Sequence, residues 1–136
     1  MIPLVFHTPL PWLIQWLPDE FATLGQDEVV VKRVTPNPRP RKFVLLRDDG
    51  GPRLREVHRL HRIGAQVWAT FHDGSTDWDT LNAMSAQLLY LFEKAAKTSP
   101  LIATVTDSNG SYPVQNGPDE YRYLTVELQL RGTPTP

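Results

Sequence analysis

One cluster in the sequence combines residue types that could bind a metal. The His58-x-x-His61 pair, with His72 and Asp73 further on, combines metal-ligand residue types at short spacing. On an extended strand, side chains three residues apart point to opposite faces, so His58 and His61 would share a metal only in a helix. This segment is not predicted to be helical, and we therefore expect no metal site and no cofactor.

Catalytic patterns are also missing from the sequence. Asp77 and Asp79 precede an apolar helical pattern, where carboxylates stabilise a helix N-terminus, so capping explains this acidic pair better than catalysis. Residues 50–52 lack the Lys and the helix start of a phosphate-binding loop, and no Gly-x-Ser-x-Gly elbow occurs. An active site needs several convergent polar groups, and none can be assembled here, so we expect that the protein is not an enzyme.

Basic residues are concentrated in one part of the chain. Residues 32–62 hold ten bases and three acids, net +7, whereas the remainder holds four bases and twelve acids, net −8. Such a polar chain suits contact with copies of itself or with a charged partner. A basic, solvated strand face is one alternative, and nucleic-acid binding is another. Only Phe43 is aromatic within residues 32–62, which leaves few stacking platforms for bases.

A proline-rich segment, residues 33–41, which we call the arm, lies between two apolar, β-type runs. Pro36, Pro38 and Pro40 remove three backbone donors and hold φ near −65°, so the arm is neither helix nor central strand. Each residue before a proline is also pushed to extended geometry. We expect a stiff, extended arm with basic residues at its base and tip, positioned to contact a partner.

A short N-terminal helix is expected over residues 9–17. Thr8 can cap it, and Pro18 either ends it or starts a short extra turn. Trp12 and Trp16 on this helix are expected in the core, with an interface role as the alternative.

A long helix is expected from residues 75–79 to about Lys97. Thr76 as N-cap with Asp79 three residues on resembles a capping box. The apolar stripe of this helix is expected to be core rather than a cofactor site. Its members are Trp78, Leu81, Met84, Leu88, Leu91, Phe92 and Ala95.

Alternating and β-branched runs predict strands over residues 28–34, 42–47, 62–71, 101–106 and 121–131. Residues 53–60 are expected to be extended or partly looped. Turns are expected at residues 48–52 and 107–111, followed by a mobile linker through residues 117–118. Runs of strands with few helices indicate an α+β class. We expect a largely antiparallel or mixed sheet of about five strands, packed by one long helix and one short N-terminal helix.

The bulk composition bounds the kind of protein. A chain of 136 residues is expected to form one domain, residues 1–132, with a flexible tail at residues 133–136. No apolar run approaches the ~20 residues of a membrane span, and the N-terminus has no signal-peptide pattern. There is no Cys, which fits synthesis in a reducing compartment.

Several motifs follow one another in a set order along the chain. They are the arm with the following Phe43-Val44 and Gly50-Gly51, the run at residues 65–69 leading into the long helix, and the closing Tyr121-Arg122-Tyr123, residues 125–128 and residues 130–132. Their order resembles that of the tail terminator (tail completion) proteins of long-tailed siphophages, especially those that infect actinobacteria. The resemblance covers nearly the whole chain, from the first helix to Gly132. Residues 53–62 depart from it, because they are more basic than expected.

The resemblance implies a structural role without catalysis, cofactor or membrane. Such proteins form a ring, usually of six copies, at the head-proximal end of the tail tube. The implied partners are other copies of the chain, the major tail tube protein and the head–tail connector, with DNA only as passing cargo in the lumen. The implied location is the virion, after synthesis in the host bacterial cytoplasm. Another head–tail neck or connector protein, or a small nucleic-acid-binding module, is the alternative.

The arm, the basic residues that follow it and the closing strand supply the residues that we expect at a subunit interface or facing the tube. The expected interface residues are Arg33, Asn37, Arg39, Arg41, Lys42, Arg53, Arg55, Tyr121 and Tyr123.

Overall fold

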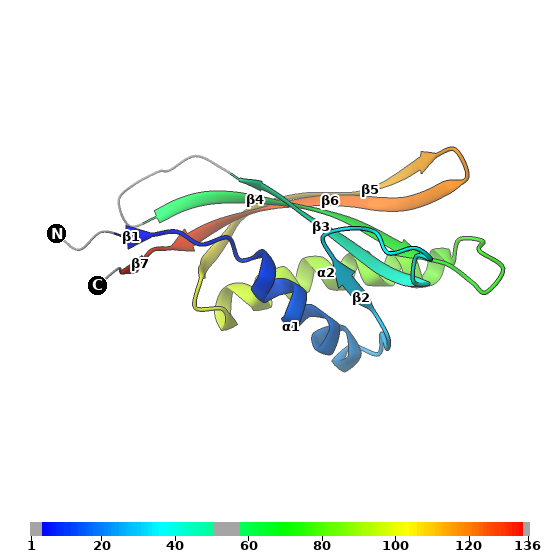
Figure 1. Cartoon of the computed structure of the whole chain (residues 1–136), viewed down its shortest axis with the longest axis horizontal. Helices are drawn as coiled ribbons and strands as arrows, with labels where there is room; N and C mark the ends of the chain where they lie inside the picture. Colours follow the sequence, from blue (N-terminus) through cyan, green and yellow to red (C-terminus); the bar gives the residue numbers. More distant parts are fainter. Residues whose placement is uncertain (1–3, 51–57, 135–136) are drawn as a thin grey trace.

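The computed structural model describes residues 4–50 and 58–134, which form a five-stranded sheet with two helices on one face (Figure 1). A second, two-stranded sheet joins the two ends of the chain. The predicted α+β class is therefore confirmed. In chain order the elements are β1 (Leu4–Val5), α1 (Leu10–Thr23), β2 (Val30–Lys32), β3 (Lys42–Gly50), β4 (His58–Ala69), α2 (Trp78–Thr98), β5 (Ile102–Asn116), β6 (Asp119–Arg131) and β7 (Thr133–Pro134).

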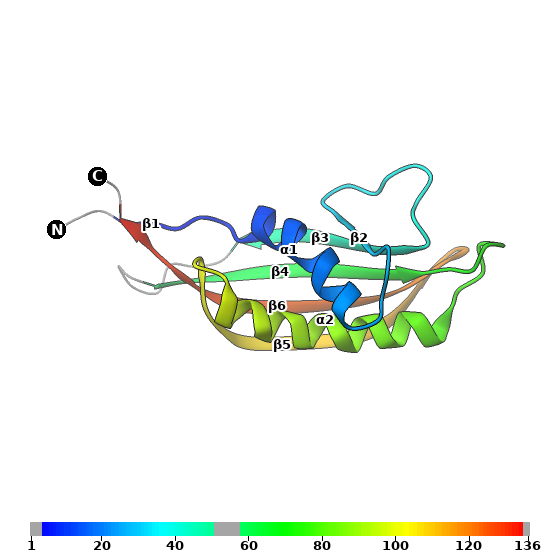
Figure 2. The same cartoon turned by 90° about the horizontal axis from the view of Figure 1, so that it is seen from below.

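The large sheet has the strand order β2-β3-β4-β6-β5. β2 runs parallel to β3, and the other neighbours are antiparallel. A parallel pair needs a crossover that brings the chain back to the starting end. The arm is this crossover, and it projects beyond the β2–β3 edge, whereas β5 forms the opposite edge (Figure 2).

The core lies between the sheet and the helices. Alternate residues of β4 and β6, such as Ile63, Val67 and Val126, face α2 and are almost fully buried. The predicted stripe of α2 meets them, except that Trp78 is 38% exposed at the start of the helix. The third strand was expected to run to residue 71, but β4 ends at residue 69 and Phe71 is 53% exposed.

Helix α1 continues through Pro18 to Thr23, so the helix neither ends at this proline nor restarts there as a separate short turn. Leu13, Leu17 and Phe21 on both sides of the proline are fully buried, and this packing offsets the cost of an interior proline. Thr8 is not the N-cap, which is Pro9, although the Thr8 hydroxyl accepts a bond from a backbone N–H of the first turn.

The two helices also differ from expectation in their contacts. Trp12 and Trp16 stack with ring centroids 4.9 Å apart and pack half-buried against the core. The N-cap of α2 is Asp77 rather than Thr76, because the Asp77 carboxylate accepts from the backbone N–H of Thr80 at 3.1 Å. Neither helix in residues 4–50 and 58–134 is long and apolar enough to cross a membrane.

Strand β5 runs through the segment that was expected to be a turn and a mobile linker. Its pairing with β6 shifts register at three places, one of them beside Gly110, whose φ is +104°. These shifts let the ladder absorb the glycine- and asparagine-containing residues 107–111 without ending the strand. Thr133 and Pro134, expected in a frayed tail, pair with β1.

Candidate interaction surface

The face of the sheet that points away from the helices, which we call the open face, carries aromatic and arginine side chains. Phe43 and Trp68 are paired across β3 and β4 on this face, and neither belongs to the core between the sheet and the helices. Both are nevertheless buried, at 0% and 6% exposure. Trp68 stacks on Tyr121 of β6, with ring centroids 4.5 Å apart. An aromatic cluster therefore spans three strands of this face.

Arg39 fastens the arm to this cluster. Its guanidinium carbon lies 3.8 Å from the centroid of the Trp68 ring, and its Nη1 lies 3.7 Å from Asp119 Oδ1. A guanidinium over an indole ring is attracted by the negative face of the π system. Arg39, Trp68 and Tyr121 thus form a stack that joins the crossover to the centre of the sheet.

Arg47 and Tyr123 form a second polar group on the same face. Arg47 Nε donates to Asp49 Oδ1 at 2.8 Å, and Arg47 Nη2 donates to Tyr123 Oη at 2.9 Å. The hydrogen bond to Asp49 raises the pKa of Arg47, so the guanidinium stays charged. Gly64 makes room for the group, since a Cβ there would lie 2.9 Å from Tyr123 Oη.

The remaining predicted interface residues lie away from these groups. Arg33, Asn37 and Arg41 are exposed on the arm, and Lys42 is half-buried at the start of β3. Arg41 and Lys42 line a cavity of about 480 Å³ with Asp27, Glu28, Val30, Pro40, Thr70, Phe71, His72 and Asp77. Arg53 and Arg55 lie outside the described residues. The structure thus brings Arg39, Tyr121 and Tyr123 to the open face and leaves the other described members on or beside the arm.

A polar pair between a buried histidine and a partly buried aspartate was not anticipated from the sequence. His61 is 5% exposed, and its Nε2 contacts Asp48 Oδ1. Burial raises the pKa of Asp48, but the Thr8 hydroxyl, the charge of His61 and the Gly50 N–H together outweigh it and lower that pKa. The strand alternation contained the signal, because His61 shares its face with the buried Ile63.

The residues of the metal-like cluster in the sequence belong to β4 and to the turn that follows it. His58 and His61 lie three residues apart on a strand, and His72 belongs to the turn after β4. Among residues 4–50 and 58–134, no three or more His, Cys, Asp or Glu side chains are grouped so that they could hold a metal ion.

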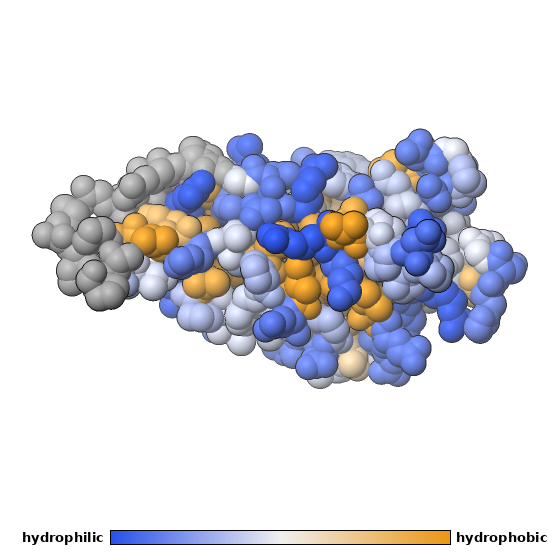
Figure 3. All heavy atoms as spheres, viewed as in Figure 1, coloured by the Kyte–Doolittle hydropathy of each residue, from blue (hydrophilic) through white to orange (hydrophobic). Residues whose placement is uncertain are grey.

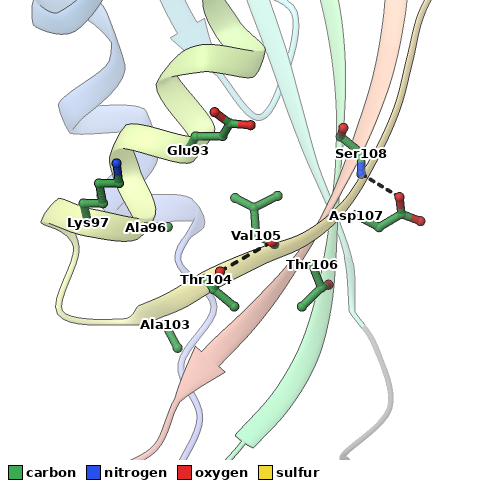
Figure 4. A pocket seen from close by; sticks show the side chains of 9 residues that line it. All are labelled: Glu93, Ala96, Lys97, Ala103, Thr104, Val105, Thr106, Asp107 and Ser108. Atoms are coloured by element: carbon green, nitrogen blue, oxygen red, sulfur yellow. Dashed lines mark hydrogen bonds between the residues drawn. The ribbon is translucent and has the colours of Figure 1, made fainter.

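A groove of about 640 Å³ runs between the last turns of α2 and the outer side of β5 (Figure 4). It is lined by Glu93, Ala96 and Lys97 from the helix and by residues 103–108 from the strand. Strand β5 is the end strand of the sheet, and no other strand of the described chain pairs with its outer side. Such an edge can accept another strand.

No protein-family model matches this chain, and no curated protein sequence matches it significantly.

Proposed function

We propose that the chain is a structural protein of a phage particle that resembles a tail terminator. It forms a ring on the head-proximal end of the tail tube, ends tube polymerisation and joins the tail to the head connector. Besides the motif order, one feature of the fold supports the proposal: the sheet has two unlike edges, the fifteen-residue β5 and the three-residue β2 with the basic arm.

Unlike edges matter because a ring closes through contacts between two different surfaces of identical copies. A sheet with two similar edge strands would not provide two different edges for such contacts. Here the exposed arm residues Arg33 and Arg41 stand at one edge, while the proline-stiffened backbone around them loses little entropy on docking. The proposal needs no catalytic group and no cofactor.

The test combines the purified protein with its major tail tube protein. Light scattering and negative-stain imaging should show rings of about six copies and tubes capped at one end. A strict monomer that never caps tubes would contradict the proposal. Gene order separates a terminator from another neck or connector protein, because a terminator gene should lie just before the tube protein gene.

The arm variants need a matched pair of substitutions. Arg41→Glu should weaken capping without loss of stability, because this side chain is exposed. Arg39→Glu should loosen the arm itself, because Arg39 contacts Trp68 and Asp119 within the same chain. If both variants cap tubes as the unmodified protein does, the arm is only a connection between strands.

A second candidate function, binding of single-stranded nucleic acid, is favoured by the open face of the sheet. The sequence between Lys32 and Arg62 offers one aromatic residue, but the fold places Tyr121 and Tyr123 beside Arg39 and Arg47. Aromatic rings beside arginines on a sheet are suited to stacking bases. The acids on this face oppose the role, because Asp49 already pairs with Arg47.

Fluorescence anisotropy with a labelled single-stranded oligonucleotide decides between the two functions. Nucleic-acid binding predicts tight association at low salt that falls steeply as salt rises and that Tyr121→Ala weakens. No association at low salt would remove this candidate.

A further inference from the structure

We infer that the outer edge of β5, with its groove against α2, receives the β2–arm–β3 edge of a second copy of this chain. The inference rests on the proposed ring and names the two surfaces that would meet in it. The strand order places β2 and β5 at opposite edges of one sheet, so a copy can present one edge to each neighbour (Figure 2).

Both edges have backbone that no strand of the described chain covers. β5 has fifteen residues and is paired only on its β6 side. On the other edge, β2 pairs with only three residues of the nine-residue β3, Phe43 to Leu45. The later part of β3 pairs with β4 on one side and has no strand of the described chain on its β2 side. Unpaired strand edges attract other strands, and a second sheet edge satisfies them through main-chain bonds.

Charge selects which edges meet. Residues 30–50, which form the β2–arm–β3 edge, contain six bases and two acids, net +4. β5 contains Asp107 and no base, and its groove adds Glu93 opposite a single Lys97. Two β2 edges would repel each other, whereas a β2 edge and a β5 edge attract, which favours head-to-tail contact between copies.

The surfaces also match in character. The β2–arm edge presents hydrophobic residues among strongly hydrophilic ones, seen directly in Figure 3. Val34 of the arm is 77% exposed, the highest fraction among the large apolar residues of the described chain. In the groove, Ala96, Ala103 and Val105 supply apolar lining beside threonine hydroxyls and the carboxylates (Figure 4). A mixed apolar and basic edge therefore fits a mixed apolar and acidic groove.

The experiment reverses charge on each edge separately. One variant carries Glu93→Lys with Asp107→Lys, and the other carries Lys32→Glu with Arg41→Glu. Sedimentation velocity between about 0.05 and 0.5 M NaCl should show association weakened at least about tenfold in each variant, and weakened by salt in the unmodified protein. An equimolar mixture of the two variants should recover assembly, since the reversed edges complement each other.

Matched controls lie outside the basic edge of residues 30–50 and outside the lining of the groove: Asp19→Lys on α1 and Arg131→Glu at the end of β6, which pairs with β4 and β5, both exposed. They should assemble like the unmodified protein, and circular dichroism checks that every variant is folded. Rings that form and cap tubes normally with either edge reversed would overturn the edge assignment but keep the proposed function. A protein that is monomeric and never caps tubes would overturn both.

Discussion

At the scale of single residues, Gly64 shows how closely the open face is packed. It lies on β4 beneath Tyr123 and beside Asp49 and Arg47. A methyl group at this position must displace the phenol oxygen, which is the acceptor for Arg47. The glycine therefore serves the side chains above it rather than a special backbone conformation.

Gly64→Ala should destabilise the protein by about 1–2 kcal/mol, the usual cost of a small overpacking change. The cost should shrink when Tyr123→Phe is added, because the added Cβ then no longer meets the phenol oxygen 2.9 Å away. Urea unfolding of the four variants of this double-mutant cycle measures the coupling. Equal costs in both backgrounds would show that Tyr123 is not the obstacle.

The Asp48 carboxylate connects stability to pH. The pKa of Asp48 in the folded protein lies below the ordinary value of 3.8. The ionised carboxylate therefore stabilises the fold at pH values above 3.8, and this stabilisation is lost as the pH falls through the folded-state pKa. Asp48→Asn should therefore flatten the fall in unfolding free energy below about pH 4. Chemical denaturation from acid to neutral pH tests this, with the exposed Asp19→Asn as control. An unchanged acid limb would contradict the assignment.

At the scale of elements, the start of α2 illustrates how a local motif can be misplaced by one residue. Asp77 accepts from the Thr80 backbone N–H and from its hydroxyl, whereas the Thr76 hydroxyl donates to Glu120 of β6 at 3.2 Å. Both residues are good N-caps in isolation. The local sequence does not show that Thr76 contacts strand β6.

Asp77→Ala should cost about 1 kcal/mol, the typical effect of removing an N-cap. Thr76→Ala is the matched control and should cost less, since it removes one partly exposed side-chain bond. Thermal unfolding followed by circular dichroism compares them. A larger loss for Thr76→Ala would restore Thr76 as the cap.

Arg39 connects the arm to the sheet through its contacts with Trp68 and Asp119. Arg39→Ala should destabilise the fold by about 1 kcal/mol through the lost contact with Trp68. It should also speed tryptic cleavage after Arg41, because a detached arm is more accessible to protease. Arg33→Ala, an exposed arm residue, serves as control. Equal cleavage rates for both variants would mean that the prolines alone keep the arm in place.

At the scale of the whole molecule, α1, α2 and the sheet share one continuous core. Helix α1 is also tied to α2 by the Glu20–Lys94 ion pair and by Gln87 Nε2, which donates to the Leu24 carbonyl at 3.3 Å. No element of this core has a separate set of buried residues. The described chain is therefore expected to unfold as one unit.

Leu88→Ala, in the middle of that core, should lower the unfolding free energy by about 2–5 kcal/mol. Trp68→Phe and Trp78→Phe leave Trp12 and Trp16 of α1 as the two remaining tryptophans. In this background, tryptophan fluorescence and far-UV circular dichroism should shift together in urea. Separate midpoints would show that α1 detaches before the sheet unfolds. Leu89→Ala, at a half-buried position next in sequence, should cost less.

The sequence alone determined the α+β class, the existence of both helices and the apolar faces of α2, β4 and β6. These depend on periodicity within one segment, which local side-chain chemistry specifies. It also located the proline-rich arm and the uneven charge, because both are properties of composition along the chain.

Only the tertiary structure decided what the local patterns left open. Helix α1 continues past Pro18 because apolar residues on both sides of this proline are buried against the core. Strand β5 continues through residues that favour a turn because it pairs with β6. Two contacts join segments that are separated in the chain: Arg39 stacks on Trp68, and His61 pairs with Asp48. The strand order, which makes β2 and β5 the opposite edges of the sheet, likewise depends on pairing between separated segments. Such contacts depend on strand order and register, which a single sequence does not encode locally.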